Sequence, residues 1–301
     1  MPHHAAALFV GLAAWDTIAL VPHFPEADSR VIAESVVEAG GGPAATAAVA
    51  CARLGVPSAF IGAIGDDLRG ARIRDALAGE GVDVSGLVLC PGAASTAAVI
   101  VADRGRGTRA LCPTLPPPLT LGPAHAARIA AAPIVHVDQA GYGPVMALSA
   151  ATAISVDAGN PIPGLDPARV TLFAPTVLQL RRMRAAQDIA TLLRHMEGPR
   201  WEVATDGGNG AFVRTDAELW HVPAYMAAPC ISTLGAGDVF HGALVAAWLH
   251  GLQAPDAAAY AAIAAGLSCR AIDGRSAIPD HPTVLAALAT HRPRPLSPQE
   301  S

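Results

Sequence analysis

The sequence predicts an α/β fold built from parallel βαβ units. Short apolar runs alternate with alanine-rich segments of helical spacing along most of the 301 residues. The chain can bury a large core, because 52% of its residues are hydrophobic and only 15% are charged. Since α/β folds of this length often form one domain, we expect a single domain over residues 1–301.

The individual elements follow from these runs. Six short apolar runs are candidate strands: Leu8–Leu12, Ser58–Ile64, Ile134–Asp138, Ala153–Asp157, Thr171–Ala174 and Trp201–Thr205. Four segments between or after them have helical spacing: Ala44–Leu54, Arg69–Glu80, Leu178–His195 and Asp238–His250. Gly55 and Gly251 follow two of these segments and suit left-handed positions that end a helix.

Two regions break the alternation and predict a small separate sheet. Ser95–Ala102 and Thr108–Leu111 flank a glycine-containing turn at Asp103–Gly107, which is typical of a hairpin. Ser29–Val37 is rich in β-branched residues and is a candidate partner strand. A second hairpin is expected from Ala211–Val213 and Leu219–Val222, across Thr215 and Asp216.

The chain contains no lysine, since all 20 of its basic residues are arginine. Phosphate-binding loops of the Walker A type and protein kinases both need a lysine on the nucleotide phosphates. Schiff-base aldolases and pyridoxal enzymes need a reactive lysine amine. The sequence therefore excludes these four classes of mechanism.

Several partner classes are also disfavoured by composition. The net charge is -5 and there is no basic run, so we expect neither nucleic acid nor an anionic membrane as a partner. No stretch of about 18 apolar residues is free of charge, proline and glycine, which predicts a soluble cytoplasmic protein. The five cysteines are scattered and favour buried thiols over disulfides or a zinc site. Histidines 136, 221, 241 and 250 lack metal-ligand spacing, and we expect their ring nitrogens to be hydrogen-bonded.

The strongest chemical motif is Thr233–Asp238, which leads directly into a predicted helix. Gly235 and Gly237 let backbone amides converge, and a helix N-terminus favours an anion. A carboxylate at Asp238 would lie beside that anion site, where it suits accepting a proton from a hydroxyl that attacks phosphorus. An ordinary loop with Asp238 as helix cap fits the same spacing.

A second glycine-rich motif, Gly40–Thr46, opens another alanine-rich helix. Its glycines let a ligand approach the backbone, and Pro43 suits a first helical turn. The motif also fits the dinucleotide pattern G-x-G-x-x-A, with Asp66 and Asp67 at the distance of a ribose contact. A nicotinamide-dependent oxidoreductase is therefore an alternative function.

Two weaker signals follow predicted strands. Thr205–Gly210 places a hydroxyl and a glycine turn after a strand, which suits nucleotide phosphates and equally fits a plain tight turn. Asp16 follows the first strand, where its carboxylate would accept hydrogen bonds from two sugar hydroxyls or be a solvated loop acid.

These motifs together resemble a known family. GGGPAATAAVACARLG (residues 40–55) and TLGAGDVFHGAL (residues 233–244) resemble the two signatures of ribokinase-like, PfkB-type carbohydrate kinases. Asp16, the Asp103–Arg109 hairpin and the Thr205–Gly207 turn follow in the family's order. Within the family, GGGPAATAAVA, DVFHGAL and GRSAIP (residues 274–279) look most like sulfofructose kinases.

The resemblance implies a three-layer α/β/α sandwich with a β lid formed by about residues 14–38 and 93–114. It implies ATP-dependent phosphorylation of a ketohexose-like sugar or related polyol, with Mg²⁺, possible K⁺ dependence, and a homodimer through the lid. Asp238 would be the base and Gly235, Ala236 and Gly237 the anion hole. Its further implied contacts are Asp16, Gly41, Gly42, Thr46 and Arg109 for the substrate, and Thr205 and Gly207 for ATP.

The sequence departs from the family pattern at three places. Ser232 replaces a usual aspartate beside a monovalent-cation site, and Thr176-Val177-Leu178-Gln179 replaces an Asn-x-x-Glu linked to magnesium. The segment Asp138–Gly141 has no arginine to bind a sulfonate. Because of the first two departures, a catalytically weakened sugar-binding protein is a further alternative.

Overall fold

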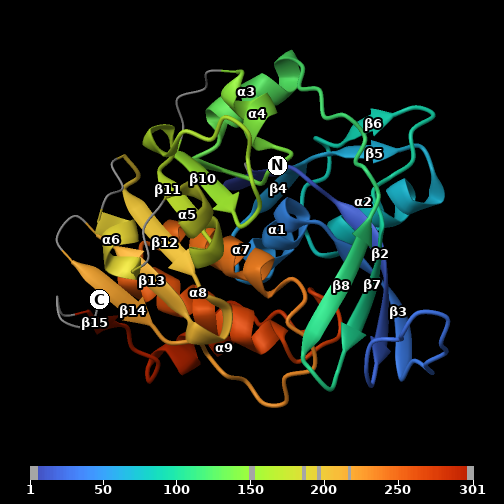
Figure 1. The fold of residues 1–301 in the computed structure, drawn as a ribbon. Coiled ribbons are helices and arrows are strands. Elements are labelled where there is room, and N and C mark those ends of the chain that lie inside the picture. The colour runs from blue at the N-terminus through green and yellow to red at the C-terminus, as the bar shows by residue number, and fades with distance from the viewer. Residues whose placement is uncertain (1–5, 149–152, 185–187, 195–197, 216–217, 297–301) are drawn as a thin grey trace.

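A computed structural model describes residues 6–148, 153–184, 188–194, 198–215 and 218–296. Its main feature is a nine-stranded sheet in the order β15-β14-β13-β12-β11-β10-β9-β1-β4 (Figure 1). These strands are β1 (Ala7–Val10), β4 (Ser58–Ile61), β9 (Ile134–Val137), β10 (Ala153–Ala158), β11 (Leu172–Pro175), β12 (Trp201–Thr205), β13 (Ala211–Arg214), β14 (Leu219–Val222) and β15 (Arg294–Pro295). The six strands from β12 to β4 pair in parallel, and the other three pair antiparallel. The predicted mostly parallel α/β fold is confirmed.

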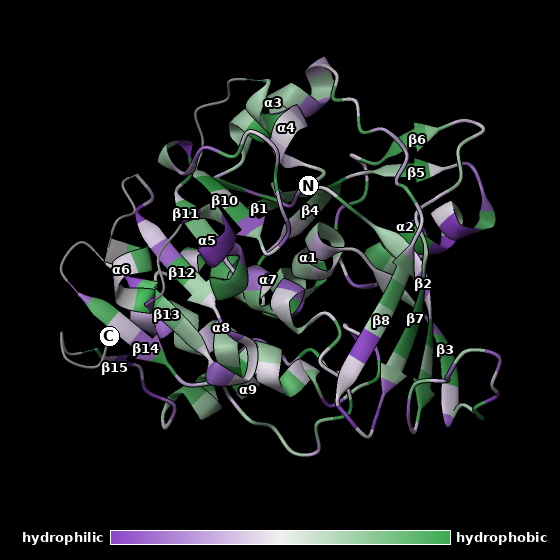
Figure 2. Ribbon diagram, in the orientation of Figure 1, coloured by the Kyte–Doolittle hydropathy of each residue, from purple (hydrophilic) through white to green (hydrophobic). Residues whose placement is uncertain are grey.

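Helices cover both faces of this sheet and create two cores. One face packs against α1 (Pro43–Arg53), α2 (Leu68–Gly79), α7 (Ala236–Leu249), α8 (Ala254–Ser268) and α9 (His281–Leu288). The other packs against α3 (Pro123–Ala131), α4 (Tyr142–Met146), α5 (Val177–Met183) and α6 (Ile189–Arg194). The sequence of β1 is continuously apolar because both faces of the strand are buried. Phe9 packs in the first core, and Leu8 and Val10 pack in the second. In Figure 2 the strands β10 and β11 of this sheet are mostly green, the hydrophobic colour.

The small residues of α1 and α7 bring these two helices close together. A Cβ on Gly242 would lie 2.2 Å from the carbonyl oxygen of Ala47, so a side chain there would force α7 away from α1. Both helices begin at glycine-rich motifs, so this contact sets the relative position of the two motifs.

A second, four-stranded sheet forms the lid, in the order β3-β2-β7-β8 (Figure 1). Its strands are β2 (Ala14–Val21), β3 (Ser35–Gly41), β7 (Ala98–Asp103) and β8 (Thr108–Pro113). Ile18, Ala98 and Ile100 line its inner face and pack against Leu234 and Ile272 of the body. The predicted small sheet and its hairpin are therefore present.

Sequence reasoning misplaced several boundaries. The predicted strand Ser58–Ile64 ends at Gly62, where a Cβ would meet the Phe60 ring at 2.5 Å, and β5 (Ala63–Gly65) pairs instead with β6 (Val88–Cys90). The candidate partner strand runs from 35 to 41 rather than from 29, and β2 was predicted only as part of the lid range 14–38, not as a strand. The predicted helix Leu178–His195 is two helices, and residues 185–187, His195 and Asp216 lie outside the described part of the chain.

In the described ranges no helix is long and apolar enough to cross a membrane.

Candidate active site

The functional motifs gather at the carboxyl ends of the parallel strands. Asp138 follows β9, Asp157 lies in β10, Thr176 follows β11 and Thr205 ends β12. The carboxyl edge of an open α/β sheet is where ligands usually bind. The lid strand β2 and the start of α7 complete this edge (Figure 1).

Asp238 lies in the first turn of α7, next to amides that are available for an anion. Gly235 adopts a left-handed conformation (φ 72°) that starts the helix. The Ala236 amide closes a turn on the Thr233 carbonyl at 3.3 Å, whereas the amides of Gly237 and Asp238 bond to no acceptor in the described chain. Gly237 leaves open space above it, because a Cβ there would meet nothing within 4 Å. The local geometry therefore fits an anion site.

The charge on Asp238 is tuned by its neighbours. The pKa of Asp238 is raised to about 7, mainly by burial and also by the nearby Asp157 and Asp138, while His241 and Arg109 oppose the increase. A carboxylate with a pKa near neutrality is a stronger proton acceptor than an ordinary aspartate and is still ionised above pH 7. The side chain is half-buried, so it can meet a ligand from the cleft.

A buried ion pair lies behind Asp238. His241, one turn further along α7, places Nε2 3.2 Å from Oδ1 of Asp157, and both side chains are buried. Asp157 raises the pKa of His241 against the effect of burial. In return, His241 is the main partner that lowers the pKa of Asp157 to about 2 despite the raising effect of its burial. The imidazole is therefore charged and balances the carboxylate.

The expectation that the histidine nitrogens are all hydrogen-bonded is wrong at two positions. Nδ1 of His241 and Nε2 of His136 are buried without a partner among the described residues. Nδ1 of His136 lies 2.9 Å from the Ser155 hydroxyl, and burial lowers the pKa of His136 to about 3, so this ring is neutral. His221 and His250 do bond to backbone carbonyl oxygens.

Asp16 lies in β2 and is buried at the lid side of the site. Its Oδ1 accepts a hydrogen bond from the Ala98 amide at 2.8 Å. Its Oδ2 points at Gly41, where a Cβ would lie only 2.0 Å away, so glycine is required. Burial raises the pKa of Asp16 to about 6, although the Ala98 amide and the charge of Arg275 both lower it. Oδ2 has no protein partner in the described chain and is free to accept a ligand hydroxyl.

The glycine-rich segment lies directly beside Asp16. Gly42 has φ 91°, and a Cβ there would lie 2.4 Å from the Leu12 carbonyl oxygen. Thr46 lies in the first turn of α1 and accepts a hydrogen bond from Nε of Arg275 at 3.2 Å. The structure thus brings Asp16, Gly41, Gly42 and Thr46 together.

This segment is poorly suited to a dinucleotide. It connects the lid strand β3 to α1, rather than a strand of the main sheet to a helix. Asp67 caps α2 by accepting from the Gly70 amide at 2.8 Å, and Asp66 accepts from the Gly92 amide at 3.0 Å. Neither carboxylate is placed as a ribose ligand of the segment, which removes the observation behind the oxidoreductase alternative.

Arg109 and the Thr205–Gly207 turn occupy two other sides. Nη1 of Arg109, in the lid strand β8, donates to Oγ1 of Thr233 at 2.9 Å, so the lid touches the loop before Asp238. Thr205 is half-buried at the end of β12, and Gly207 is exposed with φ 54°. The turn is open to solvent at the same edge as Asp157.

Asp138 is structural rather than a substrate ligand. Its two oxygens accept hydrogen bonds from the backbone amides of Leu12, Ala44, Ala140 and Gly141 at 2.7–3.2 Å. It therefore joins the end of β1, the start of α1 and the turn after β9. Sequence reasoning identified this segment only by its lack of arginine.

Arg275 is the substrate-side residue whose role sequence reasoning missed. It is buried, and its Nη2 donates to the Gly41 carbonyl oxygen at 2.8 Å. A Cβ on Gly40 would lie 2.3 Å from its Nη1. The only sequence signal was its place in GRSAIP, which does not reveal its contact with a segment more than 200 residues earlier.

Comparisons with known proteins show the family to which the chain belongs. The model of the pfkB family carbohydrate kinases matches residues 5–281. The chain is 28% identical over 279 residues to an ATP-dependent ribose-1-phosphate kinase of Halopiger xanaduensis, covering 90% of this chain and 94% of the relative. It is 26% identical over 300 residues to a ribokinase of Haemophilus influenzae, covering 91% and 95%.

A solved structure has the same fold. The Arabidopsis thaliana ribokinase complexed with ribose and ATP superimposes with a TM-score of 0.80 at 22% identity, over 94% of this chain and 98% of that one. The closeness to sulfofructose kinases stays a prediction, whereas the wider resemblance is confirmed. The chain belongs to the pfkB family of carbohydrate kinases.

Proposed function

We propose that this kinase transfers the terminal phosphoryl group of ATP to a hydroxyl of a sugar, ketohexose-like or a related small polyol. The observation that carries the proposal is the half-buried Asp238 carboxylate, whose pKa is near neutrality. It lies beside the backbone amides of Gly237 and Asp238, which bond to no acceptor in the described chain. A proton acceptor and an anion site in contact suit phosphoryl transfer to a hydroxyl.

The step is a displacement at phosphorus. The sugar oxygen forms a bond to the terminal phosphorus while the bond to the bridging oxygen of ADP breaks, and Asp238 takes the hydroxyl proton. The Gly235–Gly237 turn and the helix N-terminus stabilise charge on the transferred group. Arg109, held against Thr233 at 2.9 Å, adds a positive charge from the lid.

The acceptor would lie between the lid and α1. Oδ2 of Asp16 would accept hydrogen bonds from sugar hydroxyls, and the Gly41–Gly42 backbone would approach the ring, because neither glycine leaves space for a side chain. Thr46, at the start of α1, would contribute its hydroxyl. These groups hold the sugar so that one hydroxyl reaches Asp238.

The nucleotide would lie over β12. Thr205 and Gly207 stand at the carboxyl end of that strand, and the exposed Gly207 leaves room for a ligand. Mg²⁺ would accompany the phosphates and offset their charge. Thr176 and Gln179 would hold the magnesium-bound phosphates at the start of α5, and they fit because the buried Oε1 of Gln179 lacks a partner among the described residues. Any K⁺ requirement should be weak, because Ser232 offers no charge.

A homodimer through the lid accords with its outer face. Val36 and Val99 are 61% and 57% exposed. By strand register they point away from the body, opposite to Ile18 and Ile100. Exposed apolar residues on this sheet face favour association with a second sheet.

The test is release of ADP by the full chain over a panel of pentoses, hexoses, ketohexoses and their phosphate esters, with ATP and Mg²⁺. We expect turnover with at least one acceptor, and loss of turnover in Asp238→Asn. A protein that binds a sugar but releases no ADP with any acceptor would support the sugar-binding alternative instead.

A further inference from the structure

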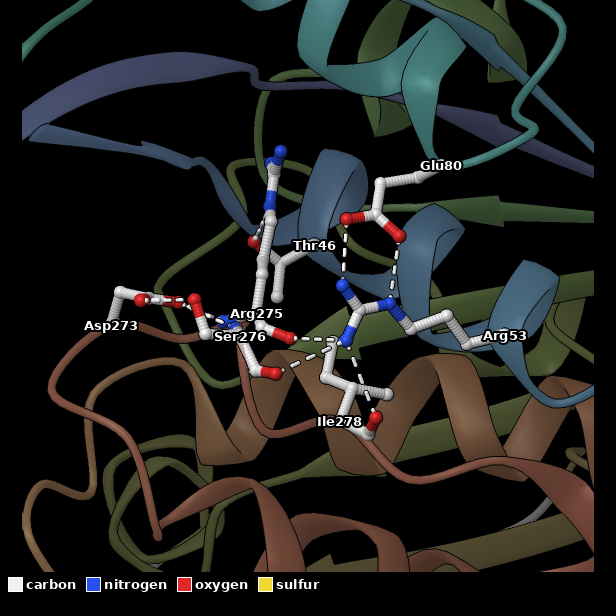
Figure 3. A network of polar contacts seen from close by, with 7 residues as sticks. All are labelled: Thr46, Arg53, Glu80, Asp273, Arg275, Ser276 and Ile278. Atoms are coloured by element: carbon white, nitrogen blue, oxygen red, sulfur yellow. Dashed lines mark hydrogen bonds and ion pairs between the residues drawn. The ribbon is translucent and has the colours of Figure 1, made fainter.

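Arg275 is a buried cation within the acceptor side of the site. Its side chain is 7% exposed. Its guanidinium donates to the Thr46 hydroxyl through Nε at 3.2 Å (Figure 3). Its Nη2 donates to the Gly41 carbonyl oxygen at 2.8 Å. Both partners belong to the segment that the sequence predicts to contact the sugar.

The loop that carries Arg275 is held firmly. Oδ1 of Asp273 accepts from the amides of Arg275 and Ser276 at 2.7 Å, and its Oδ2 accepts from the Ser276 hydroxyl at 2.6 Å. Arg53 donates to the carbonyl oxygens of residues 275, 276 and 278 (Figure 3). It also forms a bidentate ion pair with Glu80, with both distances at 2.7 Å. The position of the guanidinium is therefore set before any ligand binds.

The same loop touches the anion site. A Cβ on Gly235 would lie 2.7 Å from the Cα of Gly274, so the two backbones are in direct contact. The position of Arg275 relative to Asp238 is thus determined by a backbone contact rather than by a flexible side chain.

The charge of Arg275 has no matching carboxylate. In the part of the chain that the structure describes, no acid forms an ion pair with it. Glu80 is already paired with Arg53, and Asp273 is bonded within its own loop. Burial lowers the pKa of Arg275 to about 10, so it remains charged at neutral pH; the nearby carboxylates of Glu80, Asp16, Asp238 and Asp273 oppose the shift without bonding to the guanidinium. A buried charge without a partner is strongly destabilising and is usually kept for a function.

Unused donors remain on the guanidinium. An arginine has five N–H groups, and Nη1 of Arg275 donates to no acceptor in the described chain. Gly40 makes room for Nη1, because a Cβ there would overlap it. A cation with free, oriented N–H groups is suited to bind the oxygens of a phosphate or sulfonate.

We propose that Arg275 binds a tetrahedral oxyanion carried by the acceptor, so that the preferred acceptor is a sugar phosphate ester or a sugar sulfonate. This inference rests on the proposed kinase function and adds the chemical class of its substrate. The acceptor is favoured over the nucleotide because Arg275 bonds to Gly41 and Thr46, on the sugar side.

The lid arginines are less suited to this role. Arg106 lies in the turn after Asp103, at the end of the lid. Asp103 pairs with Val21, which is five residues along β2 from Asp16. Five residues of extended strand span about 17 Å, so Arg106 is far from the sugar contacts. Arg30 is exposed in the loop after β2, and Arg109 is bonded to Thr233.

The test compares matched acceptors that differ in one anionic group. Ribose is paired with ribose 1-phosphate, and fructose with fructose 6-phosphate and with its 6-sulfonate analogue, and kcat/KM is measured for each. We expect the parent to prefer at least one anionic member of these pairs, and the phosphate and sulfonate arms identify which oxyanion it takes. In Arg275→Gln the ratio of anionic to neutral kcat/KM should fall about 10- to 150-fold, the range for a charged hydrogen bond. Arg275→Lys should keep part of the ratio.

Two controls separate binding from structure. Arg53→Met loosens the loop that positions Arg275, so it should lower thermal stability and the ratio together. Arg128→Met removes an ion pair with Asp83 outside this loop and should leave the ratio unchanged. Gly40→Ala should displace Nη1 and lower the ratio, whereas Gly79→Ala, where a Cβ meets nothing within 4 Å, should not. The inference is overturned if the parent prefers the neutral member of every pair, or if Arg275→Gln lowers both members equally.

Calorimetric binding separates this inference from the proposed function. The sugar phosphates are titrated into the full chain with Mg²⁺ and a non-hydrolysable ATP analogue. If no acceptor is phosphorylated but a sugar phosphate binds and Arg275→Gln abolishes that binding, the inference stands and the kinase function fails. Turnover restricted to neutral sugars would leave the function intact and refute the role of Arg275.

Discussion

Replacing His241 with asparagine should raise the pKa of the catalytic base. In the parent, the imidazolium of His241 and the carboxylate of Asp157 form a buried pair with no net charge. His241→Asn leaves the Asp157 carboxylate uncompensated. Since Asp157 already raises the pKa of Asp238 and His241 lowers it, the loss of His241 removes the opposing effect.

The expected size follows from Coulomb's law. Residues three apart on a helix have Cβ atoms about 5–6 Å apart, which applies to Asp238 and His241. One unit charge at roughly 6 Å and an effective dielectric constant of about 20 contributes about 2.8 kcal/mol, or about two pKa units. Asp238 is half-buried, and solvent weakens the interaction, so we expect an increase of about one to two units.

The assay is the pH dependence of kcat/KM with a saturating concentration of ATP. The parent should lose activity as the pH falls through about 7, since the base must be ionised. In His241→Asn this acid limb should move to about pH 8–9. Asp157→Asn removes a charge that raises the pKa of Asp238, so the acid limb of this variant should not move above that of the parent. The double variant lacks both charges and should titrate near the parent.

Thermal unfolding provides a second readout of the pair. Removing one partner of a buried ion pair costs about 3–5 kcal/mol, whereas removing both is much less destabilising. His241→Asn should therefore have a lower Tm than the double variant. The reasoning is refuted if the acid limb of His241→Asn coincides with that of the parent, or if Asp157→Asn shifts it equally.

Three further outcomes are expected. Asp238→Asn should lower kcat at least about 10²-fold. Because the pKa of Asp238 is raised in the folded state, the parent loses stability as the pH rises from about 4 to about 7. The variant should therefore have a higher Tm than the parent at pH 8 and the same Tm at pH 4. Ser232→Asp should create or strengthen activation by K⁺, since a hard cation prefers charged oxygen ligands, and superimposable K⁺ titrations would contradict this. Arg109→Ala removes the lid contact with Thr233 and should raise ATP hydrolysis to water relative to sugar phosphorylation, whereas Arg104→Ala, which removes only the surface pair with Glu34, should not.

The fold was largely predictable because its signals are local. Buried parallel strands such as β1 and β9 appear as short continuous apolar runs, and glycines mark the starts of α1 and α7. The lid strand β2 was missed because its alternating pattern directly follows the apolar run of β1, so the two strands merge in the sequence. The break at Gly62 depends on its contact with Phe60, which no local pattern reveals.

The site residues also fall into those that local sequence patterns predict and those that depend on distant contacts. Asp238, Gly41 and Gly42 lie in glycine-rich turns whose backbone requirements can be inferred from the residues themselves. The roles of His241 and Arg275 depend on partners in other elements, namely Asp157 in β10 of the main sheet and Gly41 in β3 of the lid. Contacts between distant segments leave no characteristic spacing in the sequence. His241 was therefore interpreted, from its residue type and helical position, as an ordinary helix residue.

Contacts between the lid and the body connect sugar binding to the anion site. Arg109 reaches Thr233 from β8, Arg275 reaches Gly41 from the loop that packs on Gly235, and Ile18 packs near Leu234. All three contacts involve the loop before Asp238 or the loop around Gly274 that packs against it. A sugar that draws the lid inward would therefore also restrain the amides that receive the phosphoryl group. Because an anion on that sugar would pair with Arg275, the acceptor itself would compensate the buried charge of that residue.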